Sequence, residues 1–196
     1  MIQPLTQDYD NLTECQKESR KNFNSSDPWV NTHLQSQFGQ QNSKGLAKGF
    51  TMLDATDTQI IGCYSITPID VQFNLTKEEV KQIGLVKGVP ITRPLPAYLI
   101  VSLGIDQNFE GRGLGKLLLI EALMRIYEIC QHAGGVGVVV DTSNEKVRTF
   151  YEKYGFQKVP NTENRYFLAR KELIDLFESI CNLNNKLSAS IKETDL

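Results

Sequence analysis

The sequence predicts an α+β domain in which about six to seven strands are flanked by helices. Two nearly continuous apolar runs, at residues 98–105 and 136–140, are typical of central strands buried on both faces. A helical apolar period follows the first run, over residues 113–132. With 196 residues, of which 40% are hydrophobic, the chain is long enough to bury one sizeable core.

The N-terminal part is predicted to contain one short strand and two helices. The strand covers residues 2–5, and the first helix covers residues 8–21. Asp27 before Pro28 is typical of an N-cap followed by proline in the first helical turn. We expect a loop over residues 35–43, which are rich in Gln, Ser and Asn. The apolar stripe of the second helix comprises Trp29, Val30, Leu34 and Phe38.

The middle of the chain predicts a hairpin, a short helix and a long connection. Strands over residues 48–53 and 59–68 flank a polar turn. Thr76 and Glu79 have the spacing of a capping box, which predicts a short helix. Glycine and proline interrupt residues 86–96, so we expect an extended loop there.

The C-terminal part predicts further strands and helices. A helix over residues 144–154 is expected to end at Gly155, since glycine suits the left-handed position after a helix. A last helix over residues 171–187 precedes a polar tail. We therefore divide the chain into a domain over residues 1–170 and an appendage over residues 171–196. The strands expected here lie at residues 136–140, 156–159 and 165–169.

The composition argues against a nucleic-acid-binding, secreted, membrane-spanning or metal-binding protein. The net charge of -2 and the pI of 5.8 lack the strongly basic footprint of a nucleic-acid-binding protein. The N-terminus lacks a signal-peptide pattern, and no run reaches the roughly 18 apolar residues of a membrane span. The cysteines have no C-x-x-C pair, which favours reduced thiols in a cytoplasmic protein without a metal site. They are Cys15, Cys63, Cys130 and Cys181.

A glycine loop at the start of a helix predicts a phosphate site. Gly111, Gly113 and Gly115 follow a strand and open the helix over residues 113–132. The backbone N–H groups of Arg112 through Lys116, with the helix dipole, can cradle a pyrophosphate. Arg112 or Lys116 can add a charge-assisted hydrogen bond. The alternative is a tight turn with solvated basic residues.

A second motif follows the next strand and comprises Asn144, Val147, Phe150, Tyr151, Gly155 and Phe156. With the glycine loop before it, this motif resembles the GNAT superfamily of acetyl-CoA-dependent N-acyltransferases. The resemblance covers residues 98–170. It implies the GNAT fold, whose sheet is mixed and mostly antiparallel, and acetyl-CoA as the donor. Two positions depart from the family pattern, because Glu110 replaces Gln or Arg and Val147 replaces Ala.

The resemblance also implies roles for the matched residues. The backbone N–H near Ile105 would stabilise the oxyanion, and Tyr151 would protonate the departing thiolate of coenzyme A. A primary amine would attack the thioester directly in a ternary complex. The residues expected to bind the cofactor are Leu103, Gly104, Ile105, Gly111, Arg112, Gly113, Leu114, Gly115, Lys116, Asn144, Phe150 and Tyr151.

Structural alternatives stay open for three of these residues. Gly104 could serve only for packing against a helix, Tyr151 could be a packed aromatic, and Asn144 is also an N-cap candidate. We interpret His33 and His132 as structural, so the sequence shows no general base. An amine that is largely neutral near pH 8 would need only water as the proton acceptor.

The acceptor stays open between several classes. Four segments, at residues 24–34, 62–66, 90–96 and 103–115, resemble the GNAT toxins of bacterial toxin–antitoxin pairs. Those toxins acetylate the α-amine of aminoacyl-tRNA, which implies a tRNA substrate and an antitoxin partner. The acidic balance favours a small-molecule or peptide amine instead. A non-catalytic acyl-CoA sensor is disfavoured by Tyr151, and a homodimer is an open alternative for the assembly. The basic residues that could form a tRNA patch are Lys44, Lys48, Arg93, Arg112, Arg148 and Lys153.

Overall fold

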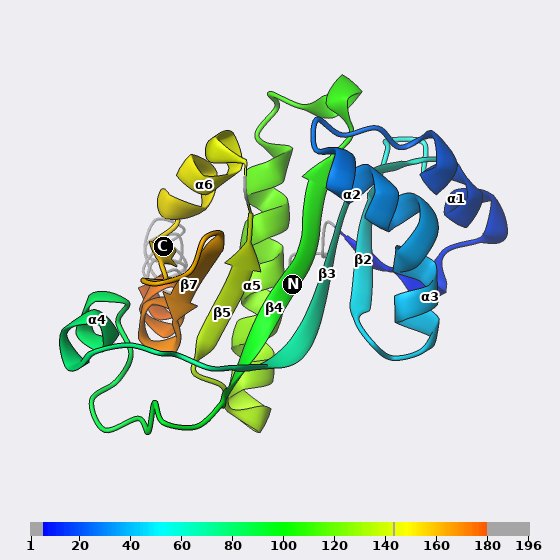
Figure 1. Cartoon of the computed structure of the whole chain (residues 1–196). Coiled ribbons are helices and arrows are strands. Elements are labelled where there is room, and N and C mark those ends of the chain that lie inside the picture. The colour runs from blue at the N-terminus through cyan, green and yellow to red at the C-terminus, as the bar shows by residue number, and fades with distance from the viewer. Residues whose placement is uncertain (1–5, 143, 180–196) are drawn as a thin grey trace, which may run out of the picture. The chain divides into compact units, whose positions relative to one another are not determined.

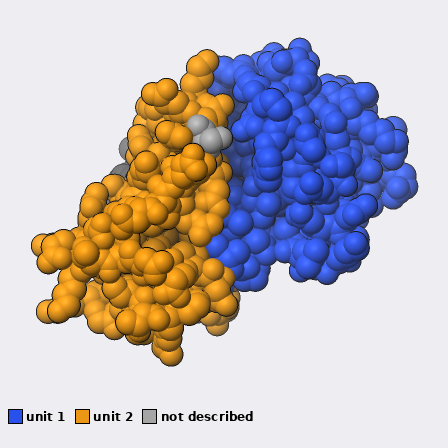
Figure 2. Space-filling view, viewed as in Figure 1, with its two compact units in different colours: residues 1–69, 98–126 blue, residues 70–97, 127–196 orange. Residues whose placement is uncertain are grey.

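The computed structural model describes residues 6–142 and 144–179. The chain divides into two compact units, one with Met1–Ile69 and Tyr98–Ile126 and the other with Asp70–Ala97 and Tyr127–Leu196 (Figure 2). The predicted number of strands is confirmed. In the described part of the chain, seven strands form a sheet in the order β1 (Gln7–Asp8), β2 (Lys48–Leu53), β3 (Ile60–Val71), β4 (Leu95–Ile105), β5 (Gly137–Asp141), β7 (Arg165–Ala169) and β6 (Gln157–Lys158) (Figure 1).

The first unit contains the predicted hairpin, in which β2 pairs antiparallel with β3. In the turn, the Asp54 carboxylate accepts hydrogen bonds from the N–H groups of Thr58 and Gln59 at 2.7 and 3.0 Å. Asp57 has a φ of 55°, a conformation that Asp tolerates in turns. The strand predicted over residues 2–5 lies outside the described residues.

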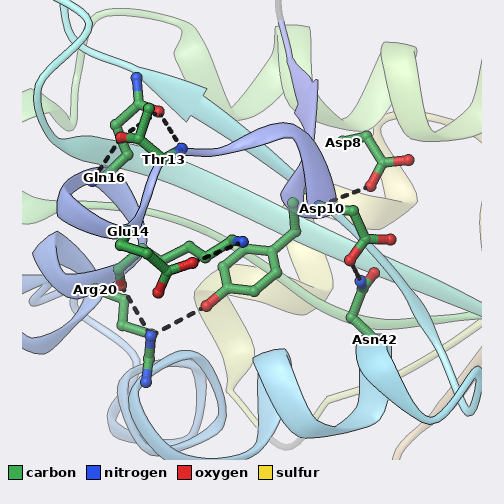
Figure 3. Close-up of polar contacts among 9 residues, drawn as sticks. Asp8, Asp10, Thr13, Glu14, Gln16, Arg20 and Asn42 are labelled. Carbon is green, nitrogen blue, oxygen red and sulfur yellow. Dashed lines mark hydrogen bonds and ion pairs between the residues drawn. The ribbon is translucent and has the colours of Figure 1, made fainter.

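The first helix, α1 (Glu14–Ser19), is shorter than the prediction of residues 8–21. Thr13 begins it with a capping box. The Thr13 N–H donates to Gln16 Oε1 at 2.8 Å, and the Gln16 N–H donates to Thr13 Oγ1 at 3.3 Å (Figure 3). The cap fixes the helix start, and Asp8 instead caps a separate 3-10 turn, η1 (Tyr9–Asn11).

The loop predicted over residues 35–43 is wrong, because the second helical region continues through it. Phe38 is buried against β2, where a Cβ at Gly49 would lie 2.4 Å from its ring. This packing outweighs the weak helix propensity of the Gln/Ser/Asn stretch. Of the predicted stripe, Trp29 is exposed and the other members are buried. The region consists of α2 (Pro28–Thr32), a π-helical segment η3 (His33–Gln37) and α3 (Phe38–Ser43).

The long helix α5 (Leu114–Ala133) confirms the predicted period. A buried polar network holds its first part to β3. Arg125 Nε donates to Tyr64 Oη at 2.7 Å, and Arg125 Nη2 donates to Glu121 Oε1 at 3.1 Å. Burial raises the pKa of Tyr64 to about 12, so this hydroxyl keeps its proton. The fully buried apolar residues of α5 are Leu118, Leu119, Ala122, Leu123 and Ile126.

In the second unit, β7 pairs antiparallel with β5 and with β6. Thr76 and Glu79 form the predicted capping box of α4 (Lys77–Gln82). The helix α6 (Glu145–Glu152) ends near Gly155, whose φ is 86°, as predicted. Residues 170–179 are helical, and the rest of the predicted last helix, the tail and Cys181 lie outside the described residues. None of the described helices is long and apolar enough to cross a membrane.

Candidate functional site

The glycine loop has the conformation that its glycines allow. A 3-10 turn, η4 (Gln107–Phe109), connects β4 to the loop. Gly111 and Gly113 have φ values of 74° and 77°, which residues with a Cβ rarely adopt. A Cβ added at Gly111, Gly113 or Gly115 would meet no atom within 4 Å. The space beside the loop backbone is therefore open.

The backbone donors of this loop make no hydrogen bond within the described part of the chain. Among residues 6–142 and 144–179, none accepts a hydrogen bond from the N–H groups of residues 111–115. The N–H groups of Lys116 and Leu117 instead donate to the Gly113 carbonyl, at 3.1 and 3.4 Å. Unpaired N–H groups at a helix N-terminus suit a phosphate, so the geometry fits the cradle that the sequence predicts.

Three predicted cofactor residues, Leu103, Gly104 and Ile105, lie at the C-terminal end of β4. A Cβ at Gly104 would stand 2.7 Å from Val30 Cγ1, so glycine allows α2 to approach the strand closely. This contact supports the packing alternative for Gly104. It also places α2 directly on the strand end that precedes the glycine loop.

Asp106 organises this strand end, a role that was not predicted from the sequence. Its buried carboxylate accepts hydrogen bonds from the Asn24 N–H at 2.9 Å and from the N–H and Nδ2 of Asn108, both at 3.0 Å. The Gln107 N–H also donates to the Asn24 carbonyl at 2.8 Å. These bonds clamp the segment before α2 to the turn before the loop. The available sequence signal was an N-cap residue directly after a strand.

The family departure at Glu110 has a structural explanation. Its Oε1 accepts a hydrogen bond from the Ser26 N–H at 3.1 Å, which ties the loop to the segment before α2. Arg112 donates to the Asn108 carbonyl at 3.0 Å, and its Cζ lies 5.0 Å from the centre of the Phe109 ring. Arg112 thus keeps an exposed cation in the loop.

The second motif lies in the second unit and forms a capped helix with an aromatic cluster. Asn144 Oδ1 accepts hydrogen bonds from the N–H groups of Lys146 and Val147 at 3.0 and 3.5 Å, so its capping role is confirmed. Tyr151 is 5% exposed, and its ring centre lies 5.4 Å from that of Phe150 and 5.2 Å from that of Phe156. The ring of Tyr151 is therefore a packed core group as well as a candidate acid.

The predicted site residues thus fall into two groups, each with a defined local structure. Asn144, Phe150 and Tyr151 belong to the second unit. The first unit contains Leu103, Gly104, Ile105, Gly111, Arg112, Gly113, Leu114, Gly115 and Lys116.

The sequence matches the acetyltransferase (GNAT) family over residues 9–156, a range that includes both motifs. The chain belongs to the GNAT acetyltransferase family. Acetyl-CoA is accordingly its acyl donor, and the open N–H groups of residues 111–115 fit the phosphates of that donor.

Individual relatives of this GNAT acetyltransferase include two bacterial toxins. A probable toxin TacT from Sinorhizobium fredii is 30% identical over 130 residues, which cover 61% of this chain and 67% of that protein. A tRNA-acetylating toxin from Mycobacterium tuberculosis is 23% identical over 150 residues, covering 76% of this chain and 85% of that protein. Both matches span well over half of this chain.

Solved structures of similar fold include AtaT complexed with acetyl-methionyl-tRNAfMet. That likeness has a TM-score of 0.74 and 22% identity, and it covers 88% of this chain and 98% of that chain. AtaTR bound with acetyl-CoA aligns with a TM-score of 0.71 and 24% identity, covering 88% and 96% of the two chains. These likenesses establish the GNAT fold.

The two histidines of this GNAT chain differ in their surroundings. His33 is 2% exposed, and its Nε2 donates to Gln41 Oε1 at 3.1 Å, while Nδ1 has no partner among the described residues. Burial lowers the pKa of His33, which favours the neutral form of the ring. His132 is exposed in the last turn of α5, where a cation complements the helix dipole.

The candidate basic patch contains one residue that is already neutralised. Lys48 Nζ lies 2.7 Å from a carboxylate oxygen of Asp8 and 2.7 Å from one of Asp10. Figure 3 shows Asp8 near Asp10, whose carboxylate accepts a hydrogen bond from Asn42, and all three residues belong to the first unit. Two carboxylates therefore share this one ammonium group, which makes Lys48 poorly suited to hold a phosphate as well. Lys44, by contrast, is exposed, and no ion pair reaches it within the described part of the chain.

Proposed function

We propose that this GNAT acetyltransferase acetylates the α-amine of aminoacyl-tRNA and is the toxin of a toxin–antitoxin pair. The observation that carries this proposal is the match to a tRNA-acetylating toxin, which extends over most of the chain. The fold shared with AtaT in its complex with acetyl-methionyl-tRNAfMet supports the same acceptor. An α-amine of this kind has a pKa near 8, which suits a site without an evident general base.

The donor is proposed to bind along the glycine loop and the end of β4. The unpaired N–H groups of residues 111–115 would hold the pyrophosphate, and Arg112 would add a positive charge. Leu103, Gly104 and Ile105 would flank the thioester, with the N–H near Ile105 aimed at the oxyanion. Asn144 and Phe150 would contact the pantetheine side of the donor.

In the proposed reaction, acetyl-CoA supplies an acetyl group activated as a thioester. The amine of the acceptor forms a bond to the carbonyl carbon, and the C–S bond then breaks. The Tyr151 hydroxyl would give its proton to the departing thiolate, and water would take the proton that the amine loses. Tyr151 would then regain its proton from solvent.

A small primary amine is the second candidate acceptor, and the charge distribution favours it. The net charge is -2, and Lys48 is bound by two carboxylates instead of facing solvent alone. Protein–RNA affinity depends strongly on Lys and Arg contacts to phosphates, and a small amine needs none of them.

The test is transfer of radiolabelled acetyl groups from acetyl-CoA to two acceptors. One acceptor is total charged tRNA, and the other is an amino-acid methyl ester, which has the same α-amine without nucleotides. Label on charged tRNA, absent from uncharged tRNA, is the expected result. Label on the ester alone would select the second candidate.

Other properties are part of the same proposal. We assign catalysis to residues 1–170 and treat residues 171–196 as an appendage. A cognate antitoxin, a homodimeric assembly and a cytoplasmic location complete the proposal.

A further inference from the structure

Trp29 is an unusual surface residue in the described part of this protein. It is the one tryptophan in the sequence, and 53% of its surface is exposed. None of the other large exposed hydrophobic residues in the described ranges is aromatic: they are Leu46, Val86, Leu117, Met124 and Leu176. An exposed aromatic ring of this size is the type of residue that most often carries binding energy.

The orientation of the indole is fixed by its stacking on His33. Its ring lies 5.0 Å from that of His33 with an interplanar angle of 5°, so the two rings are stacked. His33 is fixed in turn by its hydrogen bond to Gln41 and by an edge contact to Phe38, with ring centres 5.8 Å apart. His33 also begins the π-helical segment η3, and such segments are frequent at functional sites.

The helix that carries Trp29 is fastened to the glycine loop. The Trp29 N–H donates to the Asp27 cap at 2.9 Å, and the next residue, Val30, packs on Gly104 of β4. Just before the helix, the Ser26 N–H donates to Glu110 and the Asn24 N–H donates to Asp106. Trp29 therefore lies on a segment that hydrogen bonds tie to the glycine loop and to the end of β4, all within the same unit.

We propose that Trp29 stacks on a nucleobase at the unpaired 3′ end of the acceptor tRNA, with His33 as the positioning residue that orients the indole. This inference rests on the proposed function, because it assumes a charged tRNA as the acceptor. Proteins that bind single-stranded RNA commonly stack unpaired bases on aromatic side chains. Stacking needs no positive charge, so it supplies affinity that the net charge of -2 does not.

The test compares Trp29→Ala, Trp29→Phe and a control, Leu46→Ala, which removes another exposed hydrophobic side chain from the same unit. Trp29→Ala should raise KM for charged tRNA by about 5–150-fold, the usual effect of losing one stacked base, with a much smaller change in kcat. Trp29→Phe, which keeps a flat ring, should recover most of this loss. Leu46→Ala should match the wild type.

The control is the Tm of each variant with and without acetyl-CoA. A rise in Tm equal to that of the wild type would show that the fold and the donor site are intact. If wild-type protein labels charged tRNA and Trp29→Ala keeps the wild-type KM, the stacking proposal is overturned and the proposed function stands. A rise in KM that Trp29→Phe does not reduce also overturns it. If wild-type protein labels the amino-acid methyl ester and never charged tRNA, the proposed function fails, and this inference fails with it.

Discussion

Tyr151 combines a packing role with a proposed chemical role. Its buried ring packs against Phe150 and Phe156, so an aromatic ring is needed at this position for the fold of the second unit. Its hydroxyl is the part that proton transfer would use. A phenol is protonated at neutral pH, so it can donate its proton to a leaving thiolate without first taking a proton from another group.

Replacement of Tyr151 by Phe separates these two roles. The ring stays, so the free energy of unfolding and the affinity for acetyl-CoA should change little. Turnover should fall by roughly 10²–10⁴, the usual range for loss of a general acid. Tyr154→Phe is the matched control, because Tyr154 contacts the same Phe150 ring and has no proposed chemical role. Wild-type turnover in Tyr151→Phe, measured when chemistry limits the rate, would show that this tyrosine only packs.

His33 predicts a pH dependence of stability. Its folded pKa is lowered by burial, whereas an unfolded His titrates near pH 6.5. The unfolded state therefore binds more protons between these two values, and stability is lost as the pH falls through that range. The groups around the ring, Trp29, Phe38 and Gln41, carry no charge that would offset this.

The measurement is the urea midpoint at about pH 7.5 and about pH 5.5, on either side of the unperturbed His pKa. Wild-type protein should lose more stability than His33→Gln over this change. His132→Gln, which alters an exposed histidine, should behave as the wild type. Equal losses in all three proteins would contradict a buried neutral His33.

Among the elements, hydrogen bonds join the end of β4, η4 and the segment before α2, and together they hold the glycine loop in place. Asp106 connects them, since its carboxylate accepts hydrogen bonds from the N–H of Asn24, before α2, and from the N–H of Asn108, in η4. The loop needs a fixed backbone because its own N–H groups make no internal hydrogen bonds among the described residues. Preorganised donors of this kind lose little entropy when an anion binds.

Replacement of Asp106 by Ala should disturb both stability and donor binding. It leaves the N–H groups of Asn24 and Asn108 without their acceptor, which costs about 1–3 kcal/mol of unfolding free energy. KM for acetyl-CoA should rise as well, because the loop loses its support. Asp106→Asn keeps one acceptor oxygen and should be milder, and Asp70→Ala is an exposed control. Unchanged KM in a destabilised Asp106→Ala would limit this residue to a purely structural role.

Local patterns predicted most elements, and long-range packing explains the failures. The capping box at Thr76, the hairpin and the glycine loop depend on neighbours in sequence, so their positions were readable. The helix through residues 38–43 depends on Phe38 meeting Gly49 in β2, a contact between elements that no local pattern contains. The site shows the same division, since the glycine loop was evident from the sequence and the hydrogen bond between Asn24 and Asp106, which are 82 residues apart, was not.

For the molecule as a whole, the balance of charged residues limits how strongly the proposed tRNA substrate could bind through its phosphates. The chain is slightly acidic, and its sequence supplies 21 Lys and Arg against 23 Asp and Glu. Lys48 is already paired with Asp8 and Asp10, so it is a poor phosphate ligand despite its place in the predicted patch. If charged tRNA is the acceptor, as proposed, its binding would use a few exposed cations together with uncharged contacts.

The salt dependence of KM for charged tRNA tests this account. Lys44 is exposed, and Lys44→Gln should reduce the slope of log KM against log salt by about 1, the effect of one lost phosphate contact. Lys48→Gln removes a lysine that two carboxylates already hold, so its slope should equal that of the wild type. Equal changes in both variants would contradict the assignment of Lys48 as a structural ion pair.

The open N–H groups of the glycine loop are proposed to hold the phosphates of acetyl-CoA. Thermal unfolding with and without acetyl-CoA tests it directly, using Gly115→Glu. Gly115 lacks a positive φ, and a side chain there meets open space, so the variant should fold while its carboxylate occupies the cradle. Gln131→Glu adds the same charge near the other end of α5.

At about 100 times its Kd, acetyl-CoA should raise the Tm of the wild type and of Gln131→Glu by roughly 5–10 °C. Gly115→Glu should show no shift, because the anion site is filled and repels phosphate. A wild-type Tm that does not respond to saturating acetyl-CoA, or a Gly115→Glu variant that responds as fully as the wild type, would contradict the claim.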